Sequence, residues 1–172
     1  MDFEVIDDFL PSNQIRHIQD RLIGVKSRFP WNYNGDPIWG RDPESTQSFQ
    51  FTQIVYDCRP NTNPFSDAFP LVEPCLIKLG AQSLRRVKAN LTTKTLFHRN
   101  EGWHTDYPPS SLTLKTAILY INTNNGYTKF KKSGKIVKSV ANRMVIFPSN
   151  LEHAGFSCTD KKVRVLINFN YG

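Results

Sequence analysis

The sequence predicts an α+β fold in which helices cover one face of a β-sandwich or jelly roll. Apolar residues recur at helical spacing in two segments of the first half of the chain. After the second segment the pattern changes to short apolar runs separated by turn-forming residues, which is typical of strands. The sequence contains neither of the common glycine-rich nucleotide-binding motifs, so a nucleotide-binding α/β fold lacks its main support.

The chain opens with a predicted strand and a predicted helix. Residues Phe3–Leu10 suit a short strand, and Pro11-Ser12 supplies a break and a helix cap. A helix is expected from there to Gly24, because apolar residues recur every three or four positions with polar residues between them. These apolar residues are Ile15, Ile18, Leu22 and Ile23. We expect this helix to support a sheet.

Loops and a second helix come next. The segment Arg28–Asn63 is rich in tryptophan, glycine and proline, Trp39 among them, which indicates loops around one strand at Phe49–Tyr56. Long loops of this kind often carry substrate contacts. A second helix is predicted at Leu71–Leu79 and ends at Gly80.

The second half of the chain reads as strands separated by turns. The candidate strands are Arg85–Leu91, Thr95–Phe97, Leu112–Ile121, Ile136–Val140, Arg143–Phe147 and Val163–Asn170. The turn signals between them are Asn124-Asn125-Gly126, Ser133-Gly134, Pro148-Ser149-Asn150 and Thr159-Asp160. A chain of 172 residues suits a single domain, with residues 1–82 as helical and loop support and residues 83–172 as the β core that carries the site.

Composition indicates a globular protein that stays inside the cell. The first eight residues are acidic and lack the apolar run of a signal peptide. No stretch approaches the roughly 18 consecutive apolar residues that cross a bilayer. The three cysteines, Cys58, Cys75 and Cys158, are widely spaced and suit neither a disulfide framework nor a zinc ribbon. We therefore expect reduced cysteines, a cytoplasmic location and no membrane partner.

The net charge of +7 permits a polyanionic partner such as a nucleic acid, since clustered basic residues attract phosphates. The local lysine group consists of Lys129, Lys131, Lys132, Lys135 and Lys138. The alternative interpretation is a solvated hairpin whose lysines protect a sheet edge.

A possible metal site lies in the second half of the chain. His104 and Asp106 are two positions apart, so on an extended segment both side chains project from the same face and can chelate one ion. His153 follows a predicted strand and a turn, late enough for a neighbouring strand to deliver it to that ion. Two histidines and one carboxylate leave coordination positions open, as non-haem Fe(II) oxygenases require.

A basic residue follows in the last predicted strand. Arg164 stands among apolar residues, where a guanidinium is costly unless it meets an anion, and its planar fork suits a carboxylate. The alternative interpretation is an arginine that faces outward from an alternating strand. Lys162 would point to the same face, but it adjoins charged residues in a predicted turn, so Arg164 is preferred.

The series His104-x-Asp106, His153 and Arg164 resembles the signature of the Fe(II)/2-oxoglutarate-dependent oxygenases. The surrounding sequence is similar to the prolyl 4-hydroxylase-like branch and to compact hydroxylases of phage genomes. The segments that carry this resemblance are Ile6–Pro11, Ala117–Asn122, Gly126–Thr128 and Asn142–Pro148. The resemblance spans most of the chain and implies a double-stranded β-helix with Fe(II) and 2-oxoglutarate as cofactors and ascorbate as a reductant.

The resemblance also implies roles for other residues. Tyr120 would share the distal carboxylate of 2-oxoglutarate with the basic residue, or it is a packed strand aromatic. Asn90 and Asn168 are further candidates for cosubstrate contact, or they satisfy backbone groups. The candidates for substrate contact at the entrance are Trp103, Tyr107 and His98.

The expected reaction is hydroxylation of an unactivated C–H bond, with release of succinate and CO2. A prolyl residue in a peptide or protein is the first expected substrate, by analogy with the branch. Oxidation of a nucleic-acid base by the same chemistry is an alternative, favoured by the positive charge and by aromatic residues that could stack bases. A non-catalytic jelly-roll binding module with structural or zinc-binding histidines is a third possibility.

Overall fold

The last strand, β10 (Val163–Tyr171), lies between two layers of the molecule, and its side chains point alternately into one layer and the other. Val165, Ile167 and Phe169 face a large apolar cluster, whereas Leu166 belongs to a second, smaller cluster on the opposite face. Successive residues of a strand point to opposite sides of its sheet, so β10 separates the two layers. The computed structural model describes residues 3–35, 49–60, 65–108, 110–111 and 113–172.

Two helices lie in the first half of the chain: α1 (Ser12–Ile23) and α2 (Phe69–Leu79). Gly80 ends α2 in the left-handed conformation, as the sequence suggested. The other strands are β1 (Glu4–Ile6), β2 (Asn32–Asn34), β3 (Gln50–Asp57), β4 (Leu84–Thr93), β5 (Lys115–Tyr120), β6 (Tyr127–Phe130), β7 (Ile136–Lys138), β8 (Met144–Pro148) and β9 (His153–Phe156).

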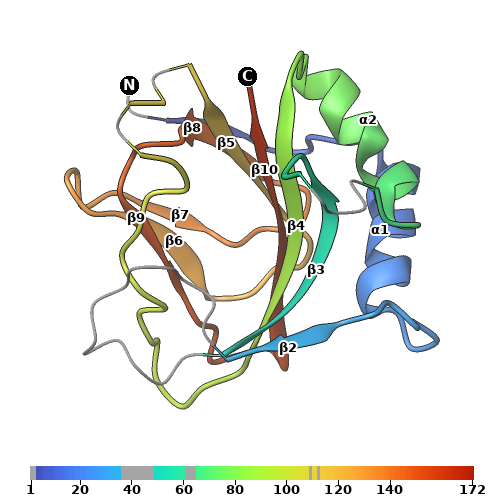
Figure 1. Cartoon of the computed structure of the whole chain (residues 1–172). Helices are drawn as coiled ribbons and strands as arrows, with labels where there is room; N and C mark the ends of the chain where they lie inside the picture. The colour runs from blue at the N-terminus through green and yellow to red at the C-terminus, as the bar shows by residue number, and fades with distance from the viewer. Residues whose placement is uncertain (1–2, 36–48, 61–64, 109, 112) are drawn as a thin grey trace.

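The strands form two antiparallel sheets (Figure 1). The larger sheet has seven strands in the order β1-β8-β5-β10-β4-β3-β2, and the smaller sheet has three in the order β7-β6-β9. The segment before β5 lies along the free edge of β9. Two isolated bridges hold it there, one from Asn100 to Phe156 and one from His104 to His153. The smaller sheet faces β5, β8 and β10, while both helices lie on the other side of the larger sheet.

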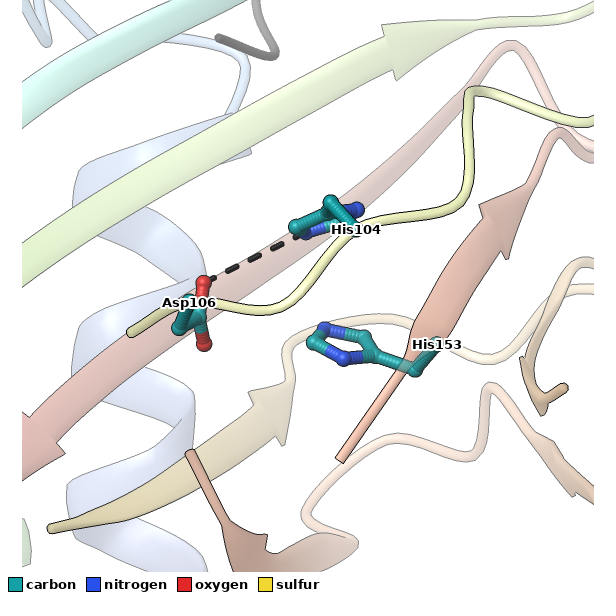
Figure 2. Close-up of side chains that lie close together, drawn as sticks. All are labelled: His104, Asp106 and His153. Atoms are coloured by element: carbon teal, nitrogen blue, oxygen red, sulfur yellow. Dashed lines mark ion pairs between the residues drawn. The ribbon is translucent and has the colours of Figure 1, made fainter. Parts of the chain in front are cut away.

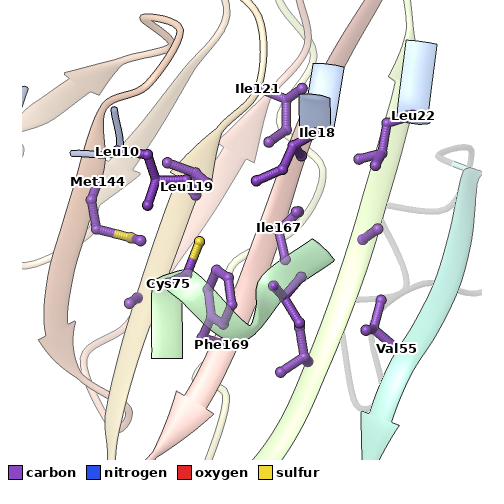
Figure 3. Packing of buried hydrophobic residues seen from close by; sticks show 14 of the residues in the cluster. Leu10, Ile18, Leu22, Val55, Cys75, Leu119, Ile121, Met144, Ile167 and Phe169 are labelled. Atoms are coloured by element: carbon purple, nitrogen blue, oxygen red, sulfur yellow. The ribbon is translucent and has the colours of Figure 1, made fainter. Parts of the chain in front are cut away.

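The apolar core has two parts. The larger part packs the helices on the seven-stranded sheet, with Ile18 and Leu22 of α1 and Cys75 of α2 against Leu119 and Phe169 (Figure 3). The smaller part fills the space between the sheets. Its buried members are Ile118, Tyr120, Phe130, Val137, Val145, Phe147 and Leu166. Because this second cluster fills only part of the space between the sheets, polar side chains occupy the rest.

The predicted α+β jelly roll with helices on one sheet is confirmed. One predicted strand is wrong: Thr95–Phe97 is a loop, in which the Thr95 hydroxyl donates to the Phe97 carbonyl oxygen over 2.7 Å. Leu96 and Phe97 are 88% and 80% exposed, so this apolar run has no layer to pack against. The predicted loops around Trp39 lie outside the described residues.

The expected lysine hairpin is the β6–β7 hairpin at the edge of the smaller sheet. Four of the five lysines are exposed and one is partly buried, and Lys131 forms an ion pair with Glu152 at 2.6 Å. The three cysteines have free thiols. Among the described residues, no helix is long and apolar enough to cross a membrane.

A matched pair of leucine substitutions tests the core. Leu119 is fully buried between the helices and the sheet, whereas Leu96 is 88% exposed. We expect Leu119→Ala to lower the free energy of unfolding by about 2–5 kcal/mol, because it leaves a cavity. Leu96→Ala should change it by less than about 0.5 kcal/mol. Urea denaturation measures both, and equal effects of the two substitutions would contradict this packing.

Candidate metal and anion site

Two backbone hydrogen bonds bring His104 and His153 together. The His104 amide donates to the His153 carbonyl oxygen over 3.0 Å, and the His153 amide donates to the His104 carbonyl oxygen over 2.9 Å. Residues that exchange both bonds lie directly opposite each other on antiparallel chains. Their imidazole rings consequently lie next to each other, with centroids 4.5 Å apart and a tilt of 47° between the ring planes. A local backbone pairing thus joins two residues that are far apart in the sequence.

Asp106 is held against the larger sheet by polar side chains. Its Oδ2 accepts hydrogen bonds from the Thr116 hydroxyl at 2.7 Å and from the amides of Asn168 at 3.2 Å and Asn170 at 3.1 Å. Its Oδ1 lies 3.6 Å from Arg86 Nη2. Because Oδ2 is occupied by three donors, Oδ1 is the oxygen that remains for a metal ion.

Hydrogen bonds also fix the tautomers of the histidines. Nδ1 of His104 lies 3.0 Å from the Gly102 carbonyl oxygen, and Nδ1 of His153 lies 2.9 Å from the Leu151 carbonyl oxygen. A carbonyl oxygen can only accept, so each Nδ1 carries the proton and each Nε2 keeps a free lone pair. Metal-binding histidines usually have this second hydrogen bond.

The three side chains fit one divalent metal ion. One ligand atom from each of His104, Asp106 and His153 lies within 4.8 Å of the others, and the side chains point toward a common centre (Figure 2). Two imidazoles and one carboxylate on one side of an octahedral ion leave the other positions for small ligands. The donor set and its hydrogen bonds therefore suit the Fe(II) site that the sequence predicted.

Burial and nearby charges set the protonation states of Asp106 and His153. Burial alone would raise the pKa of Asp106, but His153, His104, Arg86 and the Thr116 hydrogen bond outweigh it and hold the pKa well below its usual value. Burial, helped by His104, lowers the pKa of His153 to about 4. At neutral pH the carboxylate is ionised and His153 is neutral, which are the forms that bind metals.

Arg164 stands at the other end of the same pocket. The residue is 2% exposed; its Nε donates to the Ser139 hydroxyl over 3.0 Å, and its Nη2 donates to Thr128 Oγ1 over 3.2 Å. Across the described residues no further acceptor meets the guanidinium, so the N–H groups of Nη1 remain for a ligand. Gly126 makes room for the side chain, because a Cβ there would lie 2.7 Å from Arg164 Cδ.

Tyr120 packs beside Arg164 and shares a hydrogen-bond partner with it. Its side chain is fully buried, its hydroxyl donates to Thr128 Oγ1 over 2.8 Å, and its ring lies 5.7 Å from the guanidinium carbon. Thr128 Oγ1 accepts from both Tyr120 and Arg164, so its own proton is left for a group in the pocket. Lys162, the competing candidate, is exposed and precedes the strand.

The pocket between the sheets contains the metal cluster and Arg164 together. The described residues that line it are Gln50, Lys88, Asn90, Thr92, Glu101, His104, Asp106, Ile118, Thr128, His153, Gly155, Arg164, Leu166 and Asn168. Asn90 and Asn168 line the pocket, although the amide of Asn168 donates to Asp106. Trp103, Tyr107 and His98 are not among these lining residues, and His98 Nδ1 bonds the Ser157 carbonyl oxygen at 2.7 Å.

Glu101, a buried acid in this pocket, was not predicted from the sequence. Burial raises its pKa, although the charge of Arg164 opposes the shift. Its Oε1 has no hydrogen-bond partner among the described residues. Gly155 is needed beside it, because a Cβ there would lie 2.6 Å from Oε2. No motif marked this residue; its only sequence signal is its place three residues before His104.

The buried histidine predicts a pH-dependent stability of the metal-free protein. In the unfolded chain His153 takes up a proton near pH 6.5, whereas in the folded protein its pKa is about 4. Between these values the unfolded state binds more protons, so the free energy of unfolding falls as the pH falls. We expect His153 to account for a loss on the order of 3 kcal/mol, measurable by urea denaturation with a chelator present.

The control for this effect is His153→Gln, which has no titrating group at the position. Its free energy of unfolding should fall less steeply between pH 6.5 and pH 4. The same slope in both proteins would show that His153 is not buried in its neutral form.

Similarity to known proteins is found in the structure and not in the sequence. No protein-family model matches the sequence, and no curated protein matches it significantly. The structure is similar to a prolyl hydroxylase from Trichoplax adhaerens solved with a hypoxia inducible factor oxygen degradation domain peptide, at 13% identity over 99% of this chain and 83% of that chain, with a TM-score of 0.64.

Two further similar structures come from bacteria. A 2OG-Fe(II) oxygenase family oxidoreductase from Burkholderia pseudomallei has 11% identity over 99% of this chain and 85% of that chain, with a TM-score of 0.67. HygX from Streptomyces hygroscopicus, solved with nickel and 2-oxoglutarate bound, has 14% identity over 99% of this chain and 82% of that chain, with a TM-score of 0.62. The chain therefore has the fold of these 2-oxoglutarate-dependent oxygenases and prolyl hydroxylases.

Proposed function

We propose that this protein is an Fe(II)- and 2-oxoglutarate-dependent dioxygenase that hydroxylates an unactivated C–H bond. The observation that carries the proposal is one pocket that holds both a two-histidine, one-aspartate cluster and a buried arginine. A small dicarboxylate that chelates a metal at the cluster can present its other carboxylate to Arg164. The shared fold with oxygenases supports the same reaction.

The residues around the pocket have separable tasks in this proposal. His104, Asp106 and His153 hold Fe(II), while Arg164 and the Thr128 hydroxyl receive the distal carboxylate of 2-oxoglutarate. With both cofactors and O2 bound, the site supplies an oxidant that converts a substrate C–H bond into C–OH as 2-oxoglutarate becomes succinate and CO2. Ile118 and Leu166 give the pocket apolar walls that limit the access of water.

The proposed substrate is a prolyl residue in a peptide or protein. The similar hydroxylase from Trichoplax adhaerens was solved with a peptide, and this supports a peptide here by analogy. The chemistry at the metal does not by itself select proline, so the choice rests on that resemblance.

Cosubstrate binding under anaerobic conditions tests the proposal. Chelation of Fe(II) by the keto acid should give a visible charge-transfer band on titration with 2-oxoglutarate. We expect His104→Ala to abolish the band, because a metal ligand is lost. Arg164→Met should still bind Fe(II) but bind 2-oxoglutarate more weakly by about 2–5 kcal/mol, which is at least about thirtyfold in Kd.

The matched control is Lys162→Met, which also removes one positive charge near the start of β10 but from an exposed site. Its affinity for 2-oxoglutarate should equal that of the unaltered protein. A protein that binds zinc but gives no band with Fe(II) and 2-oxoglutarate would instead be a non-catalytic module. A Lys162→Met defect as large as that of Arg164→Met would contradict the assigned anion site.

A further inference from the structure

Strand β4 turns two basic side chains toward the metal end of the pocket. Val87 and Ala89 lie in the core beneath the helices, so their neighbours in the alternation face the space between the sheets. Lys88 lines the pocket, and Arg86 reaches Asp106 with its Nη2 3.6 Å from Oδ1. The cluster of ligands thus has a lysine and an arginine beside it.

Strand pairing places these cations at the opposite end of the pocket from Arg164. Arg164 pairs with Thr92, whereas Lys88 pairs with Asn168, whose amide holds Asp106. The two pairs are four residues apart, which is about 13 Å along the strands. A dicarboxylate that extends from the metal to Arg164 would leave Lys88 at the Asp106 end of the pocket, away from Arg164.

The charge of Asp106 acts on the Lys88 ammonium, but no anion contacts it directly in the part of the chain that the structure describes. No ion pair or hydrogen bond reaches its Nζ there, whereas Arg86 is shared between Asp106 and the side-chain oxygen of Asn170 at 3.3 Å. Burial, together with the charge of Arg86, lowers the pKa of Lys88 to about 8 against the opposing charge of Asp106, so Lys88 is still mostly charged at neutral pH. A poorly solvated charge of this kind is stabilised by an incoming anion.

The cosubstrate does not supply that anion in the proposed site. One of its carboxylates would face Arg164, and the charge of the other would be offset by the metal ion that it chelates. Arg86 is already engaged by Asp106, but it adds positive charge beside Lys88. A carboxylate of the substrate is the other anion of the proposed reaction that could meet Lys88.

We propose that Lys88, with Arg86 beside it, binds a carboxylate of the substrate close to the carbon that is hydroxylated. The inference rests on the proposed function and narrows its substrate to an acidic peptide. The carboxylate comes from an aspartate or glutamate next to the target proline, or from a proline at the free carboxyl end of a chain. The two sources present the same group to the ammonium.

Paired peptides test this inference without requiring turnover. The protein is loaded with Zn(II) and N-oxalylglycine, a 2-oxoglutarate analogue that is not decarboxylated, and peptide binding is measured by calorimetry at low salt. One pair of blocked peptides contains Asp-Pro or Asn-Pro, a second contains Pro-Asp or Pro-Asn, and a third ends in proline as a free acid or an amide. The same titrations are made on Lys88→Met and on the control Lys162→Met.

We expect the acid of at least one pair to bind about tenfold more tightly than its neutral partner, the size of one charge-assisted hydrogen bond. The pair that responds identifies the source of the carboxylate. The preference should disappear in Lys88→Met and persist in Lys162→Met. Equal binding or equal lack of binding within all three pairs overturns the inference, as does a preference that survives in Lys88→Met.

Titration of the same preparations with Fe(II) and 2-oxoglutarate separates the two proposals. If the cosubstrate binds but the peptides of each pair are not distinguished, the acidic substrate is excluded and the oxygenase proposal stands. If Lys88→Met loses affinity for 2-oxoglutarate itself, Lys88 serves the cosubstrate and this inference is wrong.

Discussion

The site depends on the reciprocal backbone hydrogen bonds between His104 and His153. They attach an irregular segment to the edge of β9 and thereby place a second imidazole opposite the first. The Asp106 amide continues this attachment by donating to the Ser149 carbonyl oxygen over 3.0 Å. This pairing brings His153 to the closely spaced ligands His104 and Asp106, although His153 is distant from them in the sequence. The smaller sheet provides one imidazole and the edge segment provides the other two ligands.

The larger sheet makes this arrangement stable because its two faces differ. On the helix side β10 presents only apolar residues to the core, while on the other side it presents Arg164, Asn168 and Asn170. Buried polar groups are costly unless they have partners, and here Asp106, Ser139 and Thr128 provide them. The helices therefore bury the apolar face and leave the polar face free to line a pocket. One side of β10 therefore stabilises the fold, and the other side lines the candidate site.

Much of the fold was predictable because its signals are local. Periodicity and a glycine stop located α1 and α2 to within a few residues, and alternating runs located β4, β5, β8 and β10. The short strands β2, β6 and β9 were not predicted, because each has only three or four residues and so gives no clear alternating pattern. Thr95–Phe97 has strand-forming residues, but the Thr95 hydroxyl closes a turn there.

Within the site, spacing in the sequence indicated His104, Asp106, His153 and Arg164, and the structure brings all four to one pocket. A position next to a metal ligand in the sequence did not predict a place in the pocket. Trp103 and Tyr107 flank the ligands but are not among the described lining residues. Lys88 reaches the pocket through strand pairing, which the sequence does not reveal.

A crystal structure of the protein grown without oxygen with Fe(II) and 2-oxoglutarate tests the central claim most directly. We predict an anomalous iron peak between Nε2 of both histidines and Oδ1 of Asp106, with a carboxylate at Arg164. Iron bound elsewhere, or a dicarboxylate that avoids Arg164, would contradict the account.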